Sequence, residues 1–207
     1  MRLRLGLAAS VAALAAAGCG SSPSNSQLAS VRPLSALVGI DQLPQPGFTV
    51  YSAGHAETAE QVAGGSAAVA AALSRDGLQS AASVSYSRQE EFATANGPLQ
   101  VSATVERFAS ASGATDAFDA DVATLDSSHG AVAVSTGPLG DAAHADSIVR
   151  ALPDGLLAVQ ITLEWRDADV IAVLVLRGRD GGTTLQDALT LAAAQQDDLV
   201  GGSAPQA

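Results

Sequence analysis

Apolar and polar residues alternate with a period of two along residues 82–92, 99–108 and 156–165, which predicts half-buried strands. The third of these stretches carries the clearest signal, because its apolar residues occupy every second position. They are Leu157, Val159, Ile161, Leu163 and Trp165. Residues 170–177 are almost wholly apolar, so we expect a central strand that is covered on both faces, at least in part. A further strand is predicted at residues 146–152, with a loop before it.

Two N-terminal stretches have other patterns. Residues 34–50 contain Pro and Gly among short apolar groups, which favours an irregular or edge segment. Residues 57–74 are rich in Ala, Glu, Gln and Leu and predict helix, with a break at Gly64-Gly65.

Two later stretches show the three-to-four spacing of amphipathic helices. Residues 113–127 predict one helix with Ser112 as its N-cap, and residues 183–199 predict another that Thr183 or Thr184 caps. Each helix follows a predicted hairpin, which suggests a weak internal repeat with both helices on one face of the sheet. Any two hairpin–helix units look alike at this level, so chance resemblance between the halves is an equal alternative.

These elements predict an α+β fold over residues 31–200, in which an antiparallel sheet of about five strands carries helices mainly on one face. That length suits one domain. The sequence holds 44 Ala, each of which buries little surface, so the larger apolar side chains of the strands must supply most of the core. Residues 201–207 are predicted to form a disordered tail.

The N-terminal residues predict a secretory signal and a lipid anchor. Arg2 and Arg4 precede a short apolar run that ends at Gly18-Cys19, and the run is too short to span a bilayer. Small residues before a Cys resemble the bacterial lipobox, although Ala16 stands where that motif usually has Leu. We therefore expect cleavage after residue 18 and attachment of acyl chains such as palmitate to Cys19, with an ordinary signal peptide or a chance Cys as the alternatives. Residues 19–30 have the composition of a flexible tether.

Charge and cysteine content exclude several classes of function. All ten basic residues are Arg, and 21 acidic residues give a net charge of −11. Without residues 1–18 the chain keeps eight Arg against 21 acidic residues, a charge of −13. Such a surface repels phosphate, which argues against nucleic acid as a partner. A single Cys excludes an internal disulfide framework and a multi-Cys zinc site.

The one candidate site outside the anchor is a cluster in the loop before residue 147. Asp141, His144 and Asp146 could bind a ligand or a cation, or could perform acid–base chemistry. In the alternative, Asp141 bonds to its own loop backbone and His144 stays in solvent. No catalytic residue, resident metal or cofactor is assigned, and the residues at 167–169 lack the Gly and Glu of a complete calcium loop.

Other polar residues are predicted to lie on the surface. His55 and His129 are expected in exposed turns. The predicted helix 113–127 carries several acidic residues on different sides, and we expect them to be solvated. They are Asp116, Asp119, Asp121 and Asp126.

Short motifs are spread along the chain after the Cys19 lipobox. They are Leu43-Pro44 with Gly47-Phe48, Leu139-Gly140-Asp141-Ala142, Trp165-Arg166 with Val170–Val173, and Leu191-Ala192 with Gln195. Together they resemble a broad set of uncharacterised secreted lipoproteins of high-GC bacteria. In that set a Gly usually occupies the turn after the aromatic-Arg pair, where this chain has Ala168-Asp169. The resemblance implies an extracytoplasmic α+β domain of unassigned function, without transferable catalytic residues.

The expected function is that of a binding, sensing or interaction module, held by its lipid at the extracytoplasmic face of the cell membrane. Its partner would be a small molecule or another envelope protein. One alternative is an envelope hydrolase that uses Asp141 and His144. Another is a carrier of an apolar ligand, which would need a cavity between the sheet and helices 113–127 and 183–199.

Overall fold

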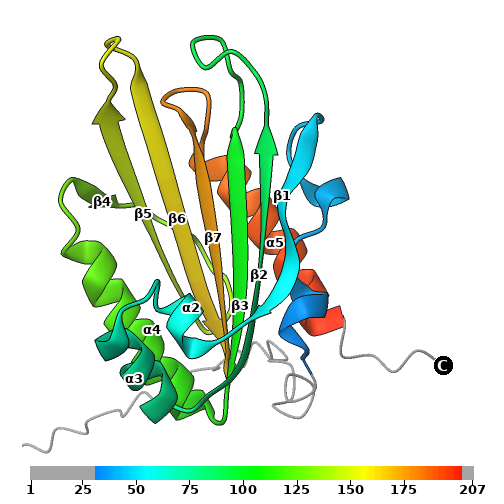
Figure 1. Ribbon diagram of the computed structural model, residues 1–207, viewed down its shortest axis with the longest axis vertical. Helices are drawn as coiled ribbons and strands as arrows, with labels where there is room; N and C mark the ends of the chain where they lie inside the picture. Colours follow the sequence, from blue (N-terminus) through cyan, green and yellow to red (C-terminus); the bar gives the residue numbers. More distant parts are fainter. Residues whose placement is uncertain (1–30, 202–207) are drawn as a thin grey trace, which may run out of the picture.

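The computed structural model describes residues 31–201, in which one antiparallel sheet of seven strands carries helices on both faces (Figure 1). The strands are β1 (Phe48–Glu57), β2 (Leu78–Arg88), β3 (Gln100–Phe108), β4 (Ala131–Ala133), β5 (Ala142–Ala151), β6 (Leu157–Asp167) and β7 (Val170–Arg179). The helical elements are η1 (Pro33–Ala36), η2 (Ile40–Gln42), α2 (Ala59–Val62), α3 (Ala67–Arg75), α4 (Ala111–Asp126) and α5 (Leu185–Gly201). The predicted signal, Cys19, the tether and the tail after residue 201 lie outside the described residues.

Two meanders of consecutive strands meet at the centre of the sheet. The strand order is β1-β2-β3-β7-β6-β5-β4, so β3 pairs with β7 across the middle. The prediction that the apolar strand at 170–177 is central is therefore confirmed. The short β4 and the long, mostly exposed β1 form the two edges.

One face of the sheet forms the main apolar core. The predicted apolar stripe of β6 lies on this face, and Leu163 and Trp165 are fully buried there. Even-numbered residues of β7, such as Leu174, point to the same side, where α5 packs with Leu191 and η1 packs with Ala36. A hydrogen bond also joins α5 to the sheet, because Trp165 Nε1 of β6 donates to Gln196 Oε1 at 2.7 Å.

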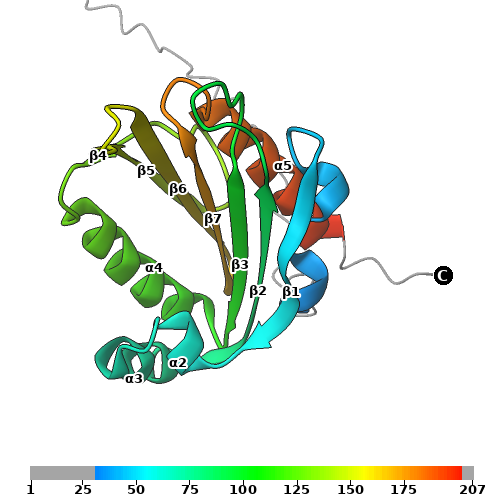
Figure 2. The ribbon, with the colours of Figure 1, turned by 45° about the horizontal axis from the view of Figure 1, so that its top comes forward.

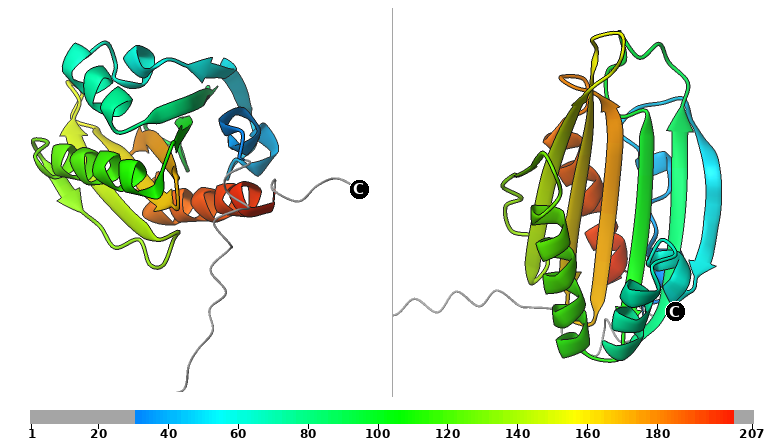
Figure 3. Two further views of the ribbon diagram at one scale, coloured as in Figure 1. Left: turned by 90° about the horizontal axis from the view of Figure 1, so that it is seen from below. Right: turned by 60° about the vertical axis from the view of Figure 1, so that its left-hand side comes forward.

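The opposite face of the sheet is covered only at one end. There α2, α3 and α4 pack around Phe108 and Ile171, with Leu73 from α3 and Phe118 from α4. The views in Figures 2 and 3 show α4 and α5 on opposite sides of the sheet. Beyond this end the sheet face is open, with a hydroxyl-rich part next to the helices and a partly apolar hollow farther along.

Helices on both faces correct the prediction that they lie mainly on one face. Consecutive residues of β7 point to opposite sides, and its odd-numbered Ile171 packs against α4 while its even-numbered Leu174 packs in the α5 core. Each half of the chain does repeat a three-strand meander followed by a helix. Because the two helices cover different faces, the halves are not related in the way that the predicted repeat required.

Several element boundaries also differ from prediction. Helix α4 begins after Ser110, whose hydroxyl accepts from the Gly113 N–H at 3.1 Å, so Ser110 rather than Ser112 is the N-cap. At α5, Thr184 and Asp187 bond reciprocally, which identifies Thr184 as the capping residue. Strand β5 begins at Ala142, inside the stretch predicted as a loop.

Among residues 31–201, no helix combines the length and the apolar character needed to cross a membrane.

Candidate functional site

The open face of the sheet presents a groove whose floor is rich in hydroxyl groups. Side chains from β2, β3 and β6 form this floor, while α2, α3 and α4 form the wall. The hydroxyl residues of the floor are Ser83, Ser85, Ser102, Thr104 and Thr162. Strand register explains their common orientation, because Ser83 pairs with Thr104 and Ser85 with Ser102. The groove has a volume of about 540 Å³.

Two buried carboxyl groups lie at the helix-covered end of this groove. Glu106 on β3 is 4% exposed and Glu164 on β6 is 2% exposed. One oxygen of each, Oε2 of Glu106 and Oε1 of Glu164, is buried without a hydrogen-bond partner. Asp121 of α4 faces the same groove. A buried polar atom without a hydrogen-bond partner lowers the stability of the folded state. A hydrogen-bond donor placed at this end of the groove would therefore be favourable for both carboxyl groups.

The environment favours the neutral form of all three acids. Burial, followed by the charge of Asp121, raises the pKa of Glu106 to about 8. Burial and the neighbouring Asp121 and Glu106 raise the pKa of Glu164 to about 9. Burial also raises the pKa of Asp121. No Arg is among the described residues that line the groove, so no guanidinium group offsets these acids there.

The outer rim of the groove carries a histidine and a further acid. On β1, His55 Nε2 lies 3.1 Å from Glu57 Oε1, and the Ser83 hydroxyl donates to the same carboxylate oxygen. His55 is exposed as expected, but it lies in an edge strand that pairs with β2 rather than in a turn.

A second hollow of about 400 Å³ lies at the far end of the same sheet face. Its polar lining is basic, with Arg150 of β5 and Arg177 of β7, and Phe92 and Ile148 add apolar surface. Arg177 Nε donates to Gln160 Oε1 at 2.8 Å. The open face therefore runs from an acidic end under α4 to a basic end beside the β2–β3 connection.

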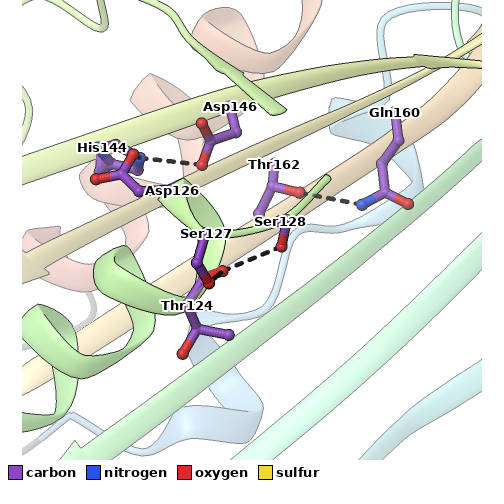
Figure 4. Close-up of polar contacts among 8 residues, drawn as sticks. All are labelled: Thr124, Asp126, Ser127, Ser128, His144, Asp146, Gln160 and Thr162. Carbon is purple, nitrogen blue, oxygen red and sulfur yellow. Dashed lines mark hydrogen bonds and ion pairs between the residues drawn. The ribbon is translucent and has the colours of Figure 1, made fainter. Parts of the chain in front are cut away.

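A cluster of one histidine and two aspartates stands beside the acidic end (Figure 4). His144 and Asp146 lie on β5, two residues apart and on one face, with His144 Nε2 3.0 Å from Asp146 Oδ2. The last residue of α4, Asp126, brings its Oδ1 to 3.4 Å from the same nitrogen. In register, His144 lies opposite Glu164 and Asp146 opposite Thr162, so the cluster borders the groove.

The structure separates the three residues of the predicted loop cluster. His144 and Asp146 are together, on a strand rather than in a loop, because β5 pairs with β6 from Ala142 onward. Asp141 lies outside the cluster. Its Oδ2 accepts from Arg166 Nη1 at 3.1 Å and from the Ala168 N–H at 2.9 Å. It thus holds the β6–β7 turn rather than its own loop, and that turn contains Ala168 at a positive φ of 50°.

Two of the α4 aspartates that were predicted to be solvated take part in the site as well. Asp121 faces the groove, and Asp126 joins His144 although its side chain is 55% exposed. Glu106 and Glu164 were not predicted as site residues at all. The available signal was the alternation itself, which put Glu106 on one face with Ser102 and Thr104.

The chemistry of the groove is that of recognition by hydrogen bonds and by carboxyl groups that are neutral until a cation favours their ionisation. Hydroxyl groups can donate or accept, and buried carboxyl groups can donate when neutral or bind a cation when ionised. The Asp126–His144–Asp146 cluster offers one nitrogen and carboxylate oxygens, a donor set that can hold a divalent metal.

Comparisons with known proteins identify no relative by sequence: no family model matches the chain, and no curated protein matches it. Among solved structures, the chain is similar to the extracellular domain of PknH from Mycobacterium tuberculosis, at 11% identity and a TM-score of 0.48. The match covers 81% of this chain and 92% of that one. A likeness at this level supports no inference about the function of this chain.

Proposed function

We propose that this protein is a lipid-anchored extracytoplasmic binding module, which holds a small ligand with a cationic amino group in the groove between the sheet and α4. The anchor part of the proposal rests on the lipobox-like residues that end at Cys19. The ligand part of the proposal rests on the buried acids and the hydroxyl groups that line the groove.

One observation supports the cationic ligand above all. Glu106, Glu164 and Asp121 converge at one end of the groove, and two of these carboxyl groups keep a buried oxygen that nothing bonds. Acids that are buried together without a cation are unfavourable for stability, which is typical of sites that serve binding rather than folding. An ammonium group would supply both the missing hydrogen bonds and the missing positive charge.

The floor of the groove suits the remainder of such a ligand. Serine and threonine hydroxyls present donors and acceptors in rows, which fits a polar molecule better than a hydrocarbon chain. On the other face, the space between the sheet and α5 is filled by side chains such as Leu191 and Ala188, both 0% exposed. The alternative of an apolar-ligand carrier therefore finds no support on that face.

The hydrolase alternative required Asp141 and His144 to act together with a third group. Asp141 instead bonds to the β6–β7 turn, and the described partners of His144 are Asp126 and Asp146. A binding role, unlike the hydrolase alternative, also accounts for the convergence of Glu106, Glu164 and Asp121 in the groove.

Calorimetric titration of the full chain in detergent tests the proposal. The probe is 1,4-diaminobutane, and the matched neutral probe is 1,4-butanediol, which has the same length and polar ends. We expect the diamine to bind and the diol not to bind at the same concentrations. Glu106→Gln should weaken diamine binding at least tenfold, because its carboxylate can no longer form. The control Glu91→Gln, at an exposed position outside the groove, should leave it unchanged. Equal binding of diol and diamine, or unchanged binding to Glu106→Gln, would overturn the proposal.

A further inference from the structure

The Asp126–His144–Asp146 cluster has a spacing that suits a metal site as well as a set of ion pairs. Three ligand atoms from two separate elements lie within 4.8 Å of one another. Two of their separations, from His144 Nε2 to Asp146 Oδ2 and to Asp126 Oδ1, are 3.0 and 3.4 Å. In a tetrahedral zinc site with bonds of about 2.0–2.1 Å, neighbouring ligand atoms are separated by about 3.3 Å.

A second observation at the same place indicates a missing partner. Asp146 has a side chain that is only 2% exposed, and it projects into the cluster beside His144 (Figure 4). Its Oδ2 meets His144 Nε2, whereas its Oδ1 is buried without any hydrogen-bond partner. Hydrogen bonds inside the cluster do not satisfy that atom. A cation shared by the carboxylate would supply the partner.

We propose that Asp126, His144 and Asp146 bind a divalent transition-metal ion of the zinc class, independently of any ligand in the groove. His144 would bind through Nε2 in its neutral form, Asp126 through Oδ1 and Asp146 through its carboxylate group, whose Oδ1 has no other partner, so two negative charges balance the ion. The imidazole nitrogen selects against calcium and magnesium, which prefer oxygen ligands alone. Three protein ligands leave the fourth position for water.

The metal would also join α4 to β5, which the chain connects through the short edge strand β4 and the loops around it. Asp126 ends α4, and His144 and Asp146 lie on β5 near the edge of the sheet. Since α4 forms a wall of the groove, a bound ion would fix that wall against the sheet.

Titration of metal-stripped full-length protein with ZnCl₂ tests the proposal, with heat as one readout and the visible absorption of a Co²⁺-substituted sample as the other. The background is Cys19→Ser, so that the protein carries neither a cysteine nor the proposed lipid anchor. We expect one ion per chain and a cobalt spectrum of tetrahedral type. His144→Ala and Asp126→Asn should each weaken zinc binding at least tenfold.

The control is His55→Ala. His55 also pairs with a carboxylate, Glu57, but the pair is not part of a three-residue cluster, so its loss should leave zinc affinity unchanged. Should His144→Ala fail to fold, Asp126→Asn still decides the question, because Asp126 is a half-exposed residue at a helix end. Absent zinc binding, or equal zinc affinity in the wild type and Asp126→Asn, would overturn the proposal.

Discussion

The buried carboxyl of Glu106 should make the protein less stable as the pH rises, and Glu106→Gln should remove that effect. Glutamine has the shape of the neutral acid but does not ionise. In the folded chain the pKa of Glu106 is raised from its usual 4.5 to about 8, first by burial and second by the charge of Asp121. The folded state therefore holds the proton over a pH range in which the unfolded chain releases it.

The sign and size of the effect follow from this difference. Below pH 4.5 both states are protonated, so Glu106 carries no penalty there. Between pH 4.5 and about 8 ionisation stabilises only the unfolded state, and the free energy of unfolding falls with rising pH. Each pKa unit corresponds to about 1.4 kcal/mol, so the penalty at pH 7 is about 3 kcal/mol. Glu106→Gln should be more stable than the wild type by about that amount at pH 7.

Urea denaturation of both proteins at pH 4, 5.5 and 7 measures the difference. The stability gain of the variant should be close to zero at pH 4 and should grow steadily to pH 7. Glu91→Gln serves as the exposed control and should show no such trend. A variant that is no more stable than the wild type at pH 7, or that is equally stabilised at pH 4, would refute the reasoning.

Three further predictions concern the rest of the chain. Ser110→Ala should lower the free energy of unfolding by about 1 kcal/mol through loss of the α4 cap, whereas Ser112→Ala should change it little; the reverse order in urea denaturation would restore Ser112 as the cap. Gly113→Ala should cost about 2 kcal/mol, because the new Cβ would lie 1.9 Å from the Asp76 carbonyl oxygen; unchanged thermal stability would show that α4 does not pack there as described. Cys19→Ala should move the protein from the membrane fraction to the medium, and unchanged fractionation would argue against the anchor.

The strands and helices could be predicted where the side-chain period is strong. Strand β6 carries an apolar residue at every second position from Leu157 to Trp165, and β7 is apolar enough to indicate a central position. Edge strand β1 was not predicted as a long strand, because most of its residues are exposed on both faces and give no period. The start of β5 was hidden by small Ala residues, which mark neither face.

The groove could not be predicted because it depends on which face each helix covers. Alternation placed Glu106 on a polar face, but only the position of α4 over that face buries it. The cluster needed contact between residues 126 and 144, which are far apart in sequence. His144 and Asp146 were predicted as candidates from their types, whereas the partner Asp126 was not.

The most direct test of the proposed binding function is the number of protons released when 1,4-diaminobutane binds at pH 7. It is measured by calorimetry in two buffers of different ionisation enthalpy. Glu106 is neutral before binding at this pH, and an ammonium group beside it favours the carboxylate. We predict release of about one proton per diamine bound, and less release in Glu106→Gln. Binding without proton release, or no binding, would contradict the account.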